Sequence, residues 1–120
     1  MEVKKHRWTD LEAEPLAEGI RRRMLNGEKL MLAEIELDRG AVVPTHSHHN
    51  EQVSHVIEGR LRFVCGENDD VVELKAGEVL VIPSNVPHSA EALSDCRVID
   101  SFSPPREDWL SGNDDYLRGK

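Results

Sequence analysis

The sequence predicts an all-β protein of one domain, because of its length, the spacing of its turn residues and the short β-rich runs between them. Its 120 residues can form one hydrophobic core but not two independent ones. Turn residues recur at short intervals, as in Asp38-Arg39-Gly40, Lys75-Ala76-Gly77 and residues 83–87. No repeat or low-complexity linker divides the chain, so we expect a single domain over residues 1–120.

Eight runs between these turns are rich in apolar and β-branched residues. Several alternate apolar and polar residues, as in Ala33, Ile35 and Leu37 against Glu34 and Glu36, which is typical of a strand with one buried face. The predicted strands are Leu30–Leu37, Ala41–Thr45, Gln52–Glu58, Leu61–Cys65, Val71–Leu74, Val79–Ile82, His88–Ala92 and Arg97–Phe102. They define a barrel core of about residues 28–103.

The two ends of the chain depart from this pattern. Residues 11–20 could form a short helical turn, but Pro15 and Gly19 exclude a long helix, so we expect a short N-terminal arm packed on the barrel. The C-terminal tail carries Trp109 and Tyr116 among charged residues. Such aromatic residues pack either on their own domain or on a second subunit.

Composition and charge narrow the possible partners. No apolar run is long enough for a membrane helix, and the first ten residues lack the features of a secretory signal, so we expect a cytoplasmic protein. A net charge of −8 would repel nucleic acid. An anionic small molecule remains possible, because a local metal or arginine can outweigh a diffuse surface charge. Cys65 and Cys96 form no Cys-x-x-Cys pair, which argues against a disulfide framework or a thiolate zinc site.

The histidines indicate a metal site. His46, His48 and Gln52 have the same parity, so their side chains can point to one face of extended chain. His88 follows a proline-bounded turn at the start of another predicted strand, and a small barrel can bring it opposite the first group. Three imidazoles and an amide oxygen suit one divalent transition metal such as Ni, Fe, Mn, Zn or Cu. These four residues are the predicted ligands.

Two further histidines have the opposite parity. We expect His55 on the outer face of the barrel or at a subunit interface, and His49 at the rim, where it could touch a substrate. Gln52 brings no charge, so the predicted site keeps the full +2 charge of its metal and should attract anions. This favours Lewis-acid chemistry over a redox cycle. A metal that only stabilises the barrel is the alternative.

The same residues resemble the two sequence motifs of the cupin superfamily. The first motif, G-x5-H-x-H-x3-E-x6-G, is matched by Gly40, His46, His48, Gln52 and Gly59, with Gln52 in place of its Glu. The second, G-x5-P-x-G-x2-H-x3-N, is matched by Gly77, Pro83 and His88, with Asn85 and Ala92 at its second Gly and its Asn. The resemblance implies a jelly-roll barrel (double-stranded β-helix), and commonly a homodimer.

A second group of candidate residues lies at the last predicted strand. Asp100 and Phe102 share parity and Arg106 follows the strand, so all three could reach one pocket. An outward Asp100 would instead be an ordinary solvated carboxylate.

The segments IDSFSPPREDWL, PTHSHHNEQ and IPSNVPH resemble small cupins of the KdgF type from pectin and alginate breakdown. Those proteins convert 4,5-unsaturated uronates into linear keto forms, so the resemblance implies a metal-dependent isomerase with a small anionic sugar substrate. It also implies that Asp100, Phe102 and Arg106 line the pocket beside the metal. The family frequently has a histidine where this chain has Asn50.

Each of these residues has a role that fits such a reaction. Asp100 could move the proton as general acid and base, Arg106 could bind the substrate carboxylate or orient Asp100, and Phe102 could exclude water. Other functions on the same barrel are a different metalloenzyme, such as a dioxygenase or a polyketide cyclase, and a non-catalytic sugar-binding protein.

Overall fold

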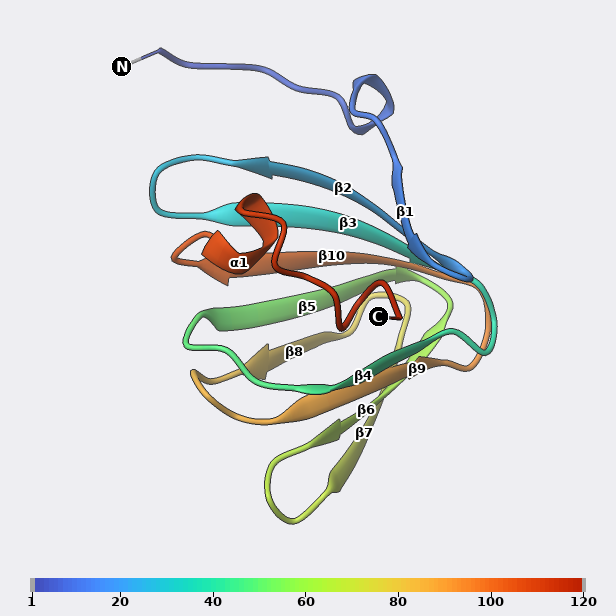
Figure 1. The fold of residues 1–120 in the computed structure, drawn as a ribbon. Coiled ribbons are helices and arrows are strands. Elements are labelled where there is room, and N and C mark those ends of the chain that lie inside the picture. Colours follow the sequence, from blue (N-terminus) through green and yellow to red (C-terminus); the bar gives the residue numbers. More distant parts are fainter. Residues whose placement is uncertain (1, 120) are drawn as a thin grey trace.

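Two antiparallel β-sheets facing each other make up the computed structural model, which describes residues 2–119 (Figure 1). One sheet has six strands in the order β1-β2-β3-β10-β5-β8, and the other has four in the order β4-β9-β6-β7. The strands are β1 Glu14–Ala17, β2 Ile20–Asn26, β3 Met31–Leu37, β4 Val42–His46, β5 Glu51–Glu58, β6 Arg60–Cys65, β7 Asp70–Lys75, β8 Val79–Ile82, β9 His88–Ala92 and β10 Cys96–Ser103. A 3₁₀ turn, η1, spans Trp8–Asp10, and helix α1 spans Glu107–Leu110.

The predicted all-β jelly-roll fold is confirmed. All eight predicted strands are present, each within one residue of its expected bounds. The chain passes from one sheet to the other between β3 and β4, and again at every later connection except the one from β6 to β7. Strands distant in sequence therefore become neighbours. In particular, β10 pairs with both β3 and β5. No helix in residues 2–119 has the length and apolar content needed to cross a membrane.

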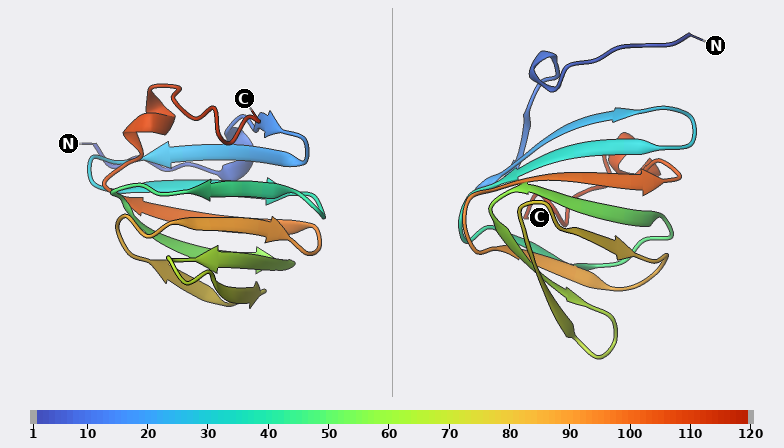
Figure 2. Two further views of the ribbon diagram at one scale, coloured as in Figure 1. Left: turned by 60° about the horizontal axis from the view of Figure 1, so that its bottom comes forward. Right: turned by 180° about the vertical axis from the view of Figure 1, so that it is seen from behind.

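A short N-terminal arm precedes β1, as predicted, but the helical turn expected over residues 11–20 is wrong. In its place β1 and β2 form a hairpin that extends the six-stranded sheet next to β3. Arg21 and Arg23 pair with acidic residues of β3 on the outer face, while Arg22 points inward and is buried. Because both faces of β2 carry arginine, no apolar alternation marked it as a strand. Residues 2–7 are exposed and lead away from the barrel (Figure 2).

The register between β5 and β10 determines which side chains enter the barrel. The inward-facing partners across these strands are Gln52 with Phe102, Ser54 with Asp100, and Val56 with Val98. Apolar residues of the opposite sheet, such as Leu61 and Phe63, complete the core. The strand pair therefore carries polar residues at one end of the barrel and apolar residues at the other.

One motif glycine is required by a close approach of two turns. Gly59, between β5 and β6, has a φ of +91°, and a Cβ atom there would lie 2.2 Å from the backbone oxygen of Asp95. A side chain would clash with that carbonyl in addition to straining the backbone. Glycine at this position thus lets the loop before β10 pack against the β5–β6 turn.

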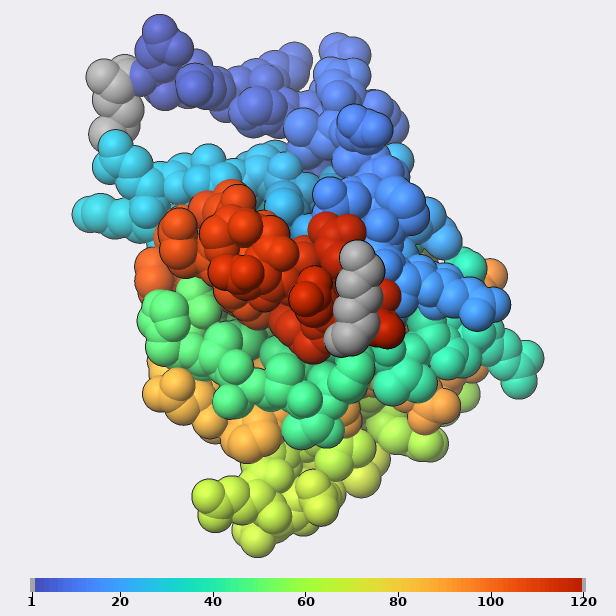
Figure 3. Space-filling model, in the orientation of Figure 1, coloured from blue at the N-terminus to red at the C-terminus, as the bar shows by residue number. Residues whose placement is uncertain are grey.

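A C-terminal segment, residues 107–119, crosses the open end of the barrel. In the space-filling view it lies, orange to red, between the N-terminal hairpin in blue and the green chain of β4 and its following loop (Figure 3). Trp109 and Leu117 are buried and Tyr116 is half-buried. Both aromatic residues of the tail therefore pack on their own domain.

Candidate metal centre

Three imidazole rings meet inside the barrel near its open end. His46 ends β4, His48 lies in the connection to β5, and His88 begins β9 directly opposite His46. Their ligand nitrogens all lie within 4.8 Å of one another. The structure therefore brings together the three predicted histidine ligands from two segments of chain.

Backbone carbonyls orient all three rings in the same way. The Nδ1 atoms of His46, His48 and His88 lie 2.8, 3.0 and 2.9 Å from the backbone oxygens of Pro44, Asn50 and Val86, respectively. A carbonyl oxygen only accepts, so each Nδ1 carries the hydrogen and each Nε2 keeps a lone pair. Each ring thus presents Nε2 as its ligand atom.

Burial keeps these rings uncharged. Desolvation lowers the pKa of His46 to about 3 and that of His48 to about 4, and it also lowers the pKa of His88. At neutral pH the lone pairs are therefore available, as metal binding requires.

Gln52 completes the group with its amide oxygen. Its Nε2 donates to the hydroxyl of Ser54 at 2.9 Å, which fixes the amide so that Oε1 points the other way, to within 3.0 Å of His48 Nε2. With the ring hydrogen of His48 on Nδ1, neither of these two close atoms carries a hydrogen, and a cation bound by both would remove their repulsion. The Nε2 atom of His88 is buried and has no hydrogen-bond partner in residues 2–119. Both observations fit a bound divalent metal.

Two neighbouring residues hold the connection that carries His48. The backbone N–H of Asn85 donates to the oxygen of His48 at 2.8 Å. Asn85 has a φ of +65°, a conformation that asparagine tolerates, which explains how it replaces the glycine of the motif. Asn50 is buried and donates to the oxygen of Pro104 at 2.7 Å. Asn50 therefore ties the His48 loop to the end of β10.

Asp100 faces the same cavity. Its Oδ1 accepts a hydrogen bond of 2.6 Å from Ser54, the residue that also receives the Gln52 amide. Desolvation raises the pKa of Asp100 to about 6, although the bond from Ser54 and the charge of Arg106 act in the opposite direction. Asp100 therefore points into the barrel and not toward solvent.

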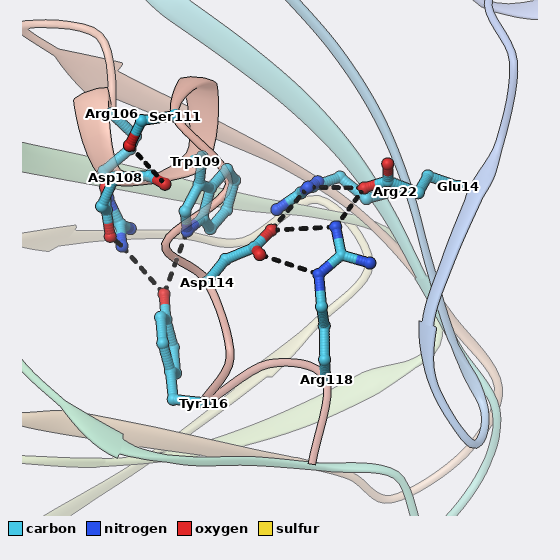
Figure 4. Close-up of polar contacts among 9 residues, drawn as sticks. All are labelled: Glu14, Arg22, Arg106, Asp108, Trp109, Ser111, Asp114, Tyr116 and Arg118. Carbon is cyan, nitrogen blue, oxygen red and sulfur yellow. Dashed lines mark hydrogen bonds and ion pairs between the residues drawn. The ribbon is translucent and has the colours of Figure 1, made fainter. Parts of the chain in front are cut away.

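Arg106 is buried under the C-terminal segment (Figure 4). Its Nε and Nη2 donate to the two oxygens of Asp108 at 2.9 and 2.7 Å, so one edge of the guanidinium is occupied. Within residues 2–119, its Nη1 has no hydrogen-bond acceptor. The guanidinium stacks on Phe102 and Trp109, with its central carbon 5.1 and 4.5 Å from the ring centres.

A family model for the cupin domain matches residues 33–102, which is more than half of the sequence. The chain belongs to the cupin family. This agrees with the two-sheet fold and with the positions of the motif residues around the three imidazoles.

Solved cupin structures are similar over nearly the whole chain. KdgF from a Halomonas species is 31% identical with a TM-score of 0.79, over 85% of this chain and 94% of that one. An RmlC-like cupin from Shewanella frigidimarina is 32% identical with a TM-score of 0.82, over 90% of this chain and 96% of that one. Oxalate decarboxylase from Lactobacillus farciminis is 20% identical with a TM-score of 0.77, over 92% of this chain and 39% of that one, which shows a shared fold.

A curated relative is larger than this cupin. Nitrosourea synthase from Streptomyces achromogenes subsp. streptozoticus is 31% identical over an alignment of 94 residues that covers 73% of this chain. The chain spans about a fifth (19%) of the length of that relative. The match therefore concerns one part of a longer enzyme.

The cavity of this cupin is small and mostly apolar. Its volume is about 50 Å³, which holds a few water molecules, whereas ligand pockets usually start at about 300 Å³. Its polar wall consists of His46, Gln52, His88, Ser89, Asp100, Arg106 and Tyr116. Trp109, Tyr116 and Leu117 of the C-terminal segment line the same cavity, so the position of this segment limits the space for a ligand.

The structure also adds residues that were not predicted. Ser54 could have been found, since it shares the parity of Gln52 two positions later on the same strand. Tyr116 and Trp109 stand among charged residues of the tail, and no sequence pattern indicates that they reach the cavity or Arg106. His55 is exposed on the outer face and His49 is exposed beside the site, outside the cavity wall.

Proposed function

We propose that this cupin, loaded with a divalent metal, converts 4,5-unsaturated uronate monosaccharides from pectin or alginate breakdown into their linear keto forms. The observation that carries the proposal is the position of Asp100, a desolvated carboxylate connected through Ser54 to the metal ligand Gln52 and lying near Arg106. The similarity to the Halomonas KdgF structure supports it.

His46, His48, Gln52 and His88 would hold the metal. All four donors are neutral, so a bound divalent ion would supply a Lewis acid of full +2 charge that stabilises negative charge on sugar oxygens. The chain contributes the orientation: carbonyl groups hold the imidazoles, and Ser54 holds the amide. Arg106 adds positive charge to the same end of the barrel.

Arg106 is the proposed contact for the substrate carboxylate. Asp108 occupies the Nε and Nη2 edge, which fixes the plane of the guanidinium, and Nη1 remains for the ligand. Such a charge-assisted hydrogen bond selects an acidic sugar over a neutral one. Because the guanidinium of Arg106 pairs with Asp108, it does not pair directly with Asp100. Desolvation therefore keeps the pKa of Asp100 raised.

Asp100 is the proposed general base and acid. The reaction moves the proton of the anomeric hydroxyl to Asp100 and breaks the bond from C1 to the ring oxygen, which leaves an aldehyde at C1 and an enolate at C5. The same carboxyl then returns a proton to C4 and the C5 oxygen becomes a ketone, so no atom is gained or lost and the change is an isomerisation. With Oδ1 held by Ser54, Oδ2 of Asp100 is the atom that takes the first proton and returns one to C4.

The apolar wall keeps competing water away from these steps. Phe102 is buried, with its ring 5.7 Å from that of His48 and 5.0 Å from that of Trp109. The stack closes the side of the site toward the C-terminal segment.

A direct assay tests the proposal. Purified protein loaded with Ni, Fe, Mn, Zn or Cu is added to unsaturated galacturonate and to the unsaturated product of alginate lyase, and loss of ultraviolet absorbance is followed. We expect acceleration with at least one metal, and its loss by at least a hundredfold in Asp100→Ala at unchanged metal content. Asp115→Ala, which removes an exposed carboxylate, is the control. No acceleration with any metal on either substrate would refute the proposal.

A different metal-dependent reaction on the same barrel is the second candidate. It is favoured by the 31% identity to part of nitrosourea synthase, since that identity equals the one to KdgF. Oxygen uptake by the iron-loaded protein, with unsaturated uronate left unchanged, would identify such an enzyme.

A further inference from the structure

Tyr116 brings a hydroxyl group from the C-terminal segment to the predicted metal site. Its ring packs on that of His46, with 4.6 Å between the ring centres, and it forms part of the cavity wall. It is the residue of the segment that touches a predicted ligand and the cavity at once.

The hydrogen bonds of Tyr116 determine what its hydroxyl can offer. Its oxygen accepts from Arg106 Nη2 at 2.8 Å and from Trp109 Nε1 at 3.1 Å (Figure 4). Guanidinium and indole groups only donate, so both lone pairs of the phenol oxygen are used. The remaining O–H has no acceptor among residues 2–119. A hydrogen-bond donor is therefore held ready beside Arg106.

We propose that Tyr116 is a substrate-contacting, specificity-determining residue that donates its hydroxyl hydrogen to the carboxylate of an anionic sugar, beside the Nη1 group of Arg106. The inference rests on the proposed function for the nature of the ligand. A carboxylate has two oxygens, and Arg106 with Tyr116 supplies one donor for each. A neutral sugar offers no such charged acceptor.

A buried ion-pair network holds the segment in the position that this contact requires. Asp114, two residues before Tyr116, is fully buried and pairs with Arg22 at 2.8 Å and with Arg118 at 2.7 Å (Figure 4). Arg22 lies over the face of Trp109 at 4.7 Å, on the same ring that contacts Arg106. Arg106 and Trp109, whose N–H groups donate to the Tyr116 oxygen, are therefore held in place by this network.

Tyr116→Phe tests the proposal, since it keeps the ring on His46 and removes only the hydroxyl. Binding of D-galacturonate and of D-galactose to the metal-loaded protein is measured by calorimetry, together with metal content. We expect galacturonate affinity to fall about tenfold or more, with galactose affinity and metal content unchanged. Asp115→Asn, an exposed carboxylate in the same segment, is the matched control and should change neither affinity.

Three results would overturn the proposal: no loss of galacturonate affinity, an equal loss for both sugars, or no galacturonate binding by the unaltered protein. A general loss of packing in the C-terminal segment predicts the second of these. The binding measurement is independent of turnover. If galacturonate binding depends on Tyr116 but unsaturated uronate is not converted, the proposed reaction fails and the carboxylate contact stands.

Discussion

The hydroxyl of Ser54 lies 2.6 Å from Oδ1 of Asp100, across two paired residues of β5 and β10. The same hydroxyl accepts the amide of Gln52, so a continuous hydrogen-bonded chain connects a predicted metal ligand to the proposed acid–base residue. Metal binding and the protonation of Asp100 are therefore expected to influence each other.

Asp100→Asn should stabilise the metal-free protein at high pH. The pKa of Asp100 lies at about 6 in the folded protein, above its ordinary 3.8, so the folded state favours the protonated form. Its contribution to stability is complete below about pH 3.8 and is lost as the pH rises through about 6. The separation corresponds to about 3 kcal/mol at most, and contact with cavity water reduces it, so we expect a gain of about 1–2 kcal/mol at pH 8.

Urea denaturation of both proteins at pH 8 and near pH 4 measures this effect. The gain should vanish near pH 4, where the native carboxyl is already neutral. A gain of equal size at both pH values would mean that ionisation of Asp100 is not its cause.

Ser54→Ala should weaken metal binding although Ser54 is no ligand. Without the hydroxyl, the Gln52 amide loses the partner that orients its oxygen toward His48. Loss of such an outer partner typically costs about 10- to 100-fold in metal affinity. Competition titrations with a chelating dye measure it. Ser101 follows Asp100 on β10, and its side chain lies on the opposite face of the sheet. The variant Ser101→Ala should therefore bind metal normally.

The sequence predicted those parts of the fold that rest on local patterns. Strands from β3 to β10 have turn residues at their ends and side-chain alternation, and the parity of His46, His48 and Gln52 follows directly from extended geometry. Parity also placed His55 outside. The common direction of the three imidazoles could not be predicted, because carbonyls of an irregular loop set it.

The parts that were missed depend on contacts between distant segments. Arg22 looked like one member of a charged run, yet it is buried because Asp114 lies 92 positions later in the chain and neutralises it. The hairpin of β1 and β2 combines such pairs with a few buried apolar residues, Leu16 and Ile20. The closure of the cavity by residues 107–119 follows from the same network, which no periodicity reveals.

Gln52→Glu should tighten metal binding and weaken the binding of anionic sugars. A carboxylate at this position partly neutralises the metal, which strengthens its hold on the ion but lowers the attraction for a substrate carboxylate. We expect the KM for unsaturated uronate to rise about tenfold while metal affinity increases. Parallel metal titrations and kinetics separate the two effects. A lower KM would contradict the role assigned to the neutral amide.

Asp114→Asn should release the C-terminal segment without unfolding the barrel. Removing the charge of Asp114 leaves Arg22 with only the half-exposed Glu14 as its ion-pair partner, at a cost of up to about 3–5 kcal/mol. Detachment of residues 107–119 would expose Arg22 to water, so the loss cannot exceed the free energy with which this segment docks. Hydrogen exchange resolved along the chain should therefore accelerate in residues 107–119 and stay slow in β3, β5 and β10, while Asp115→Asn leaves both unchanged. Uniform acceleration would instead show that the segment and the barrel unfold as one cooperative unit, and that the segment cannot lift alone to admit a sugar.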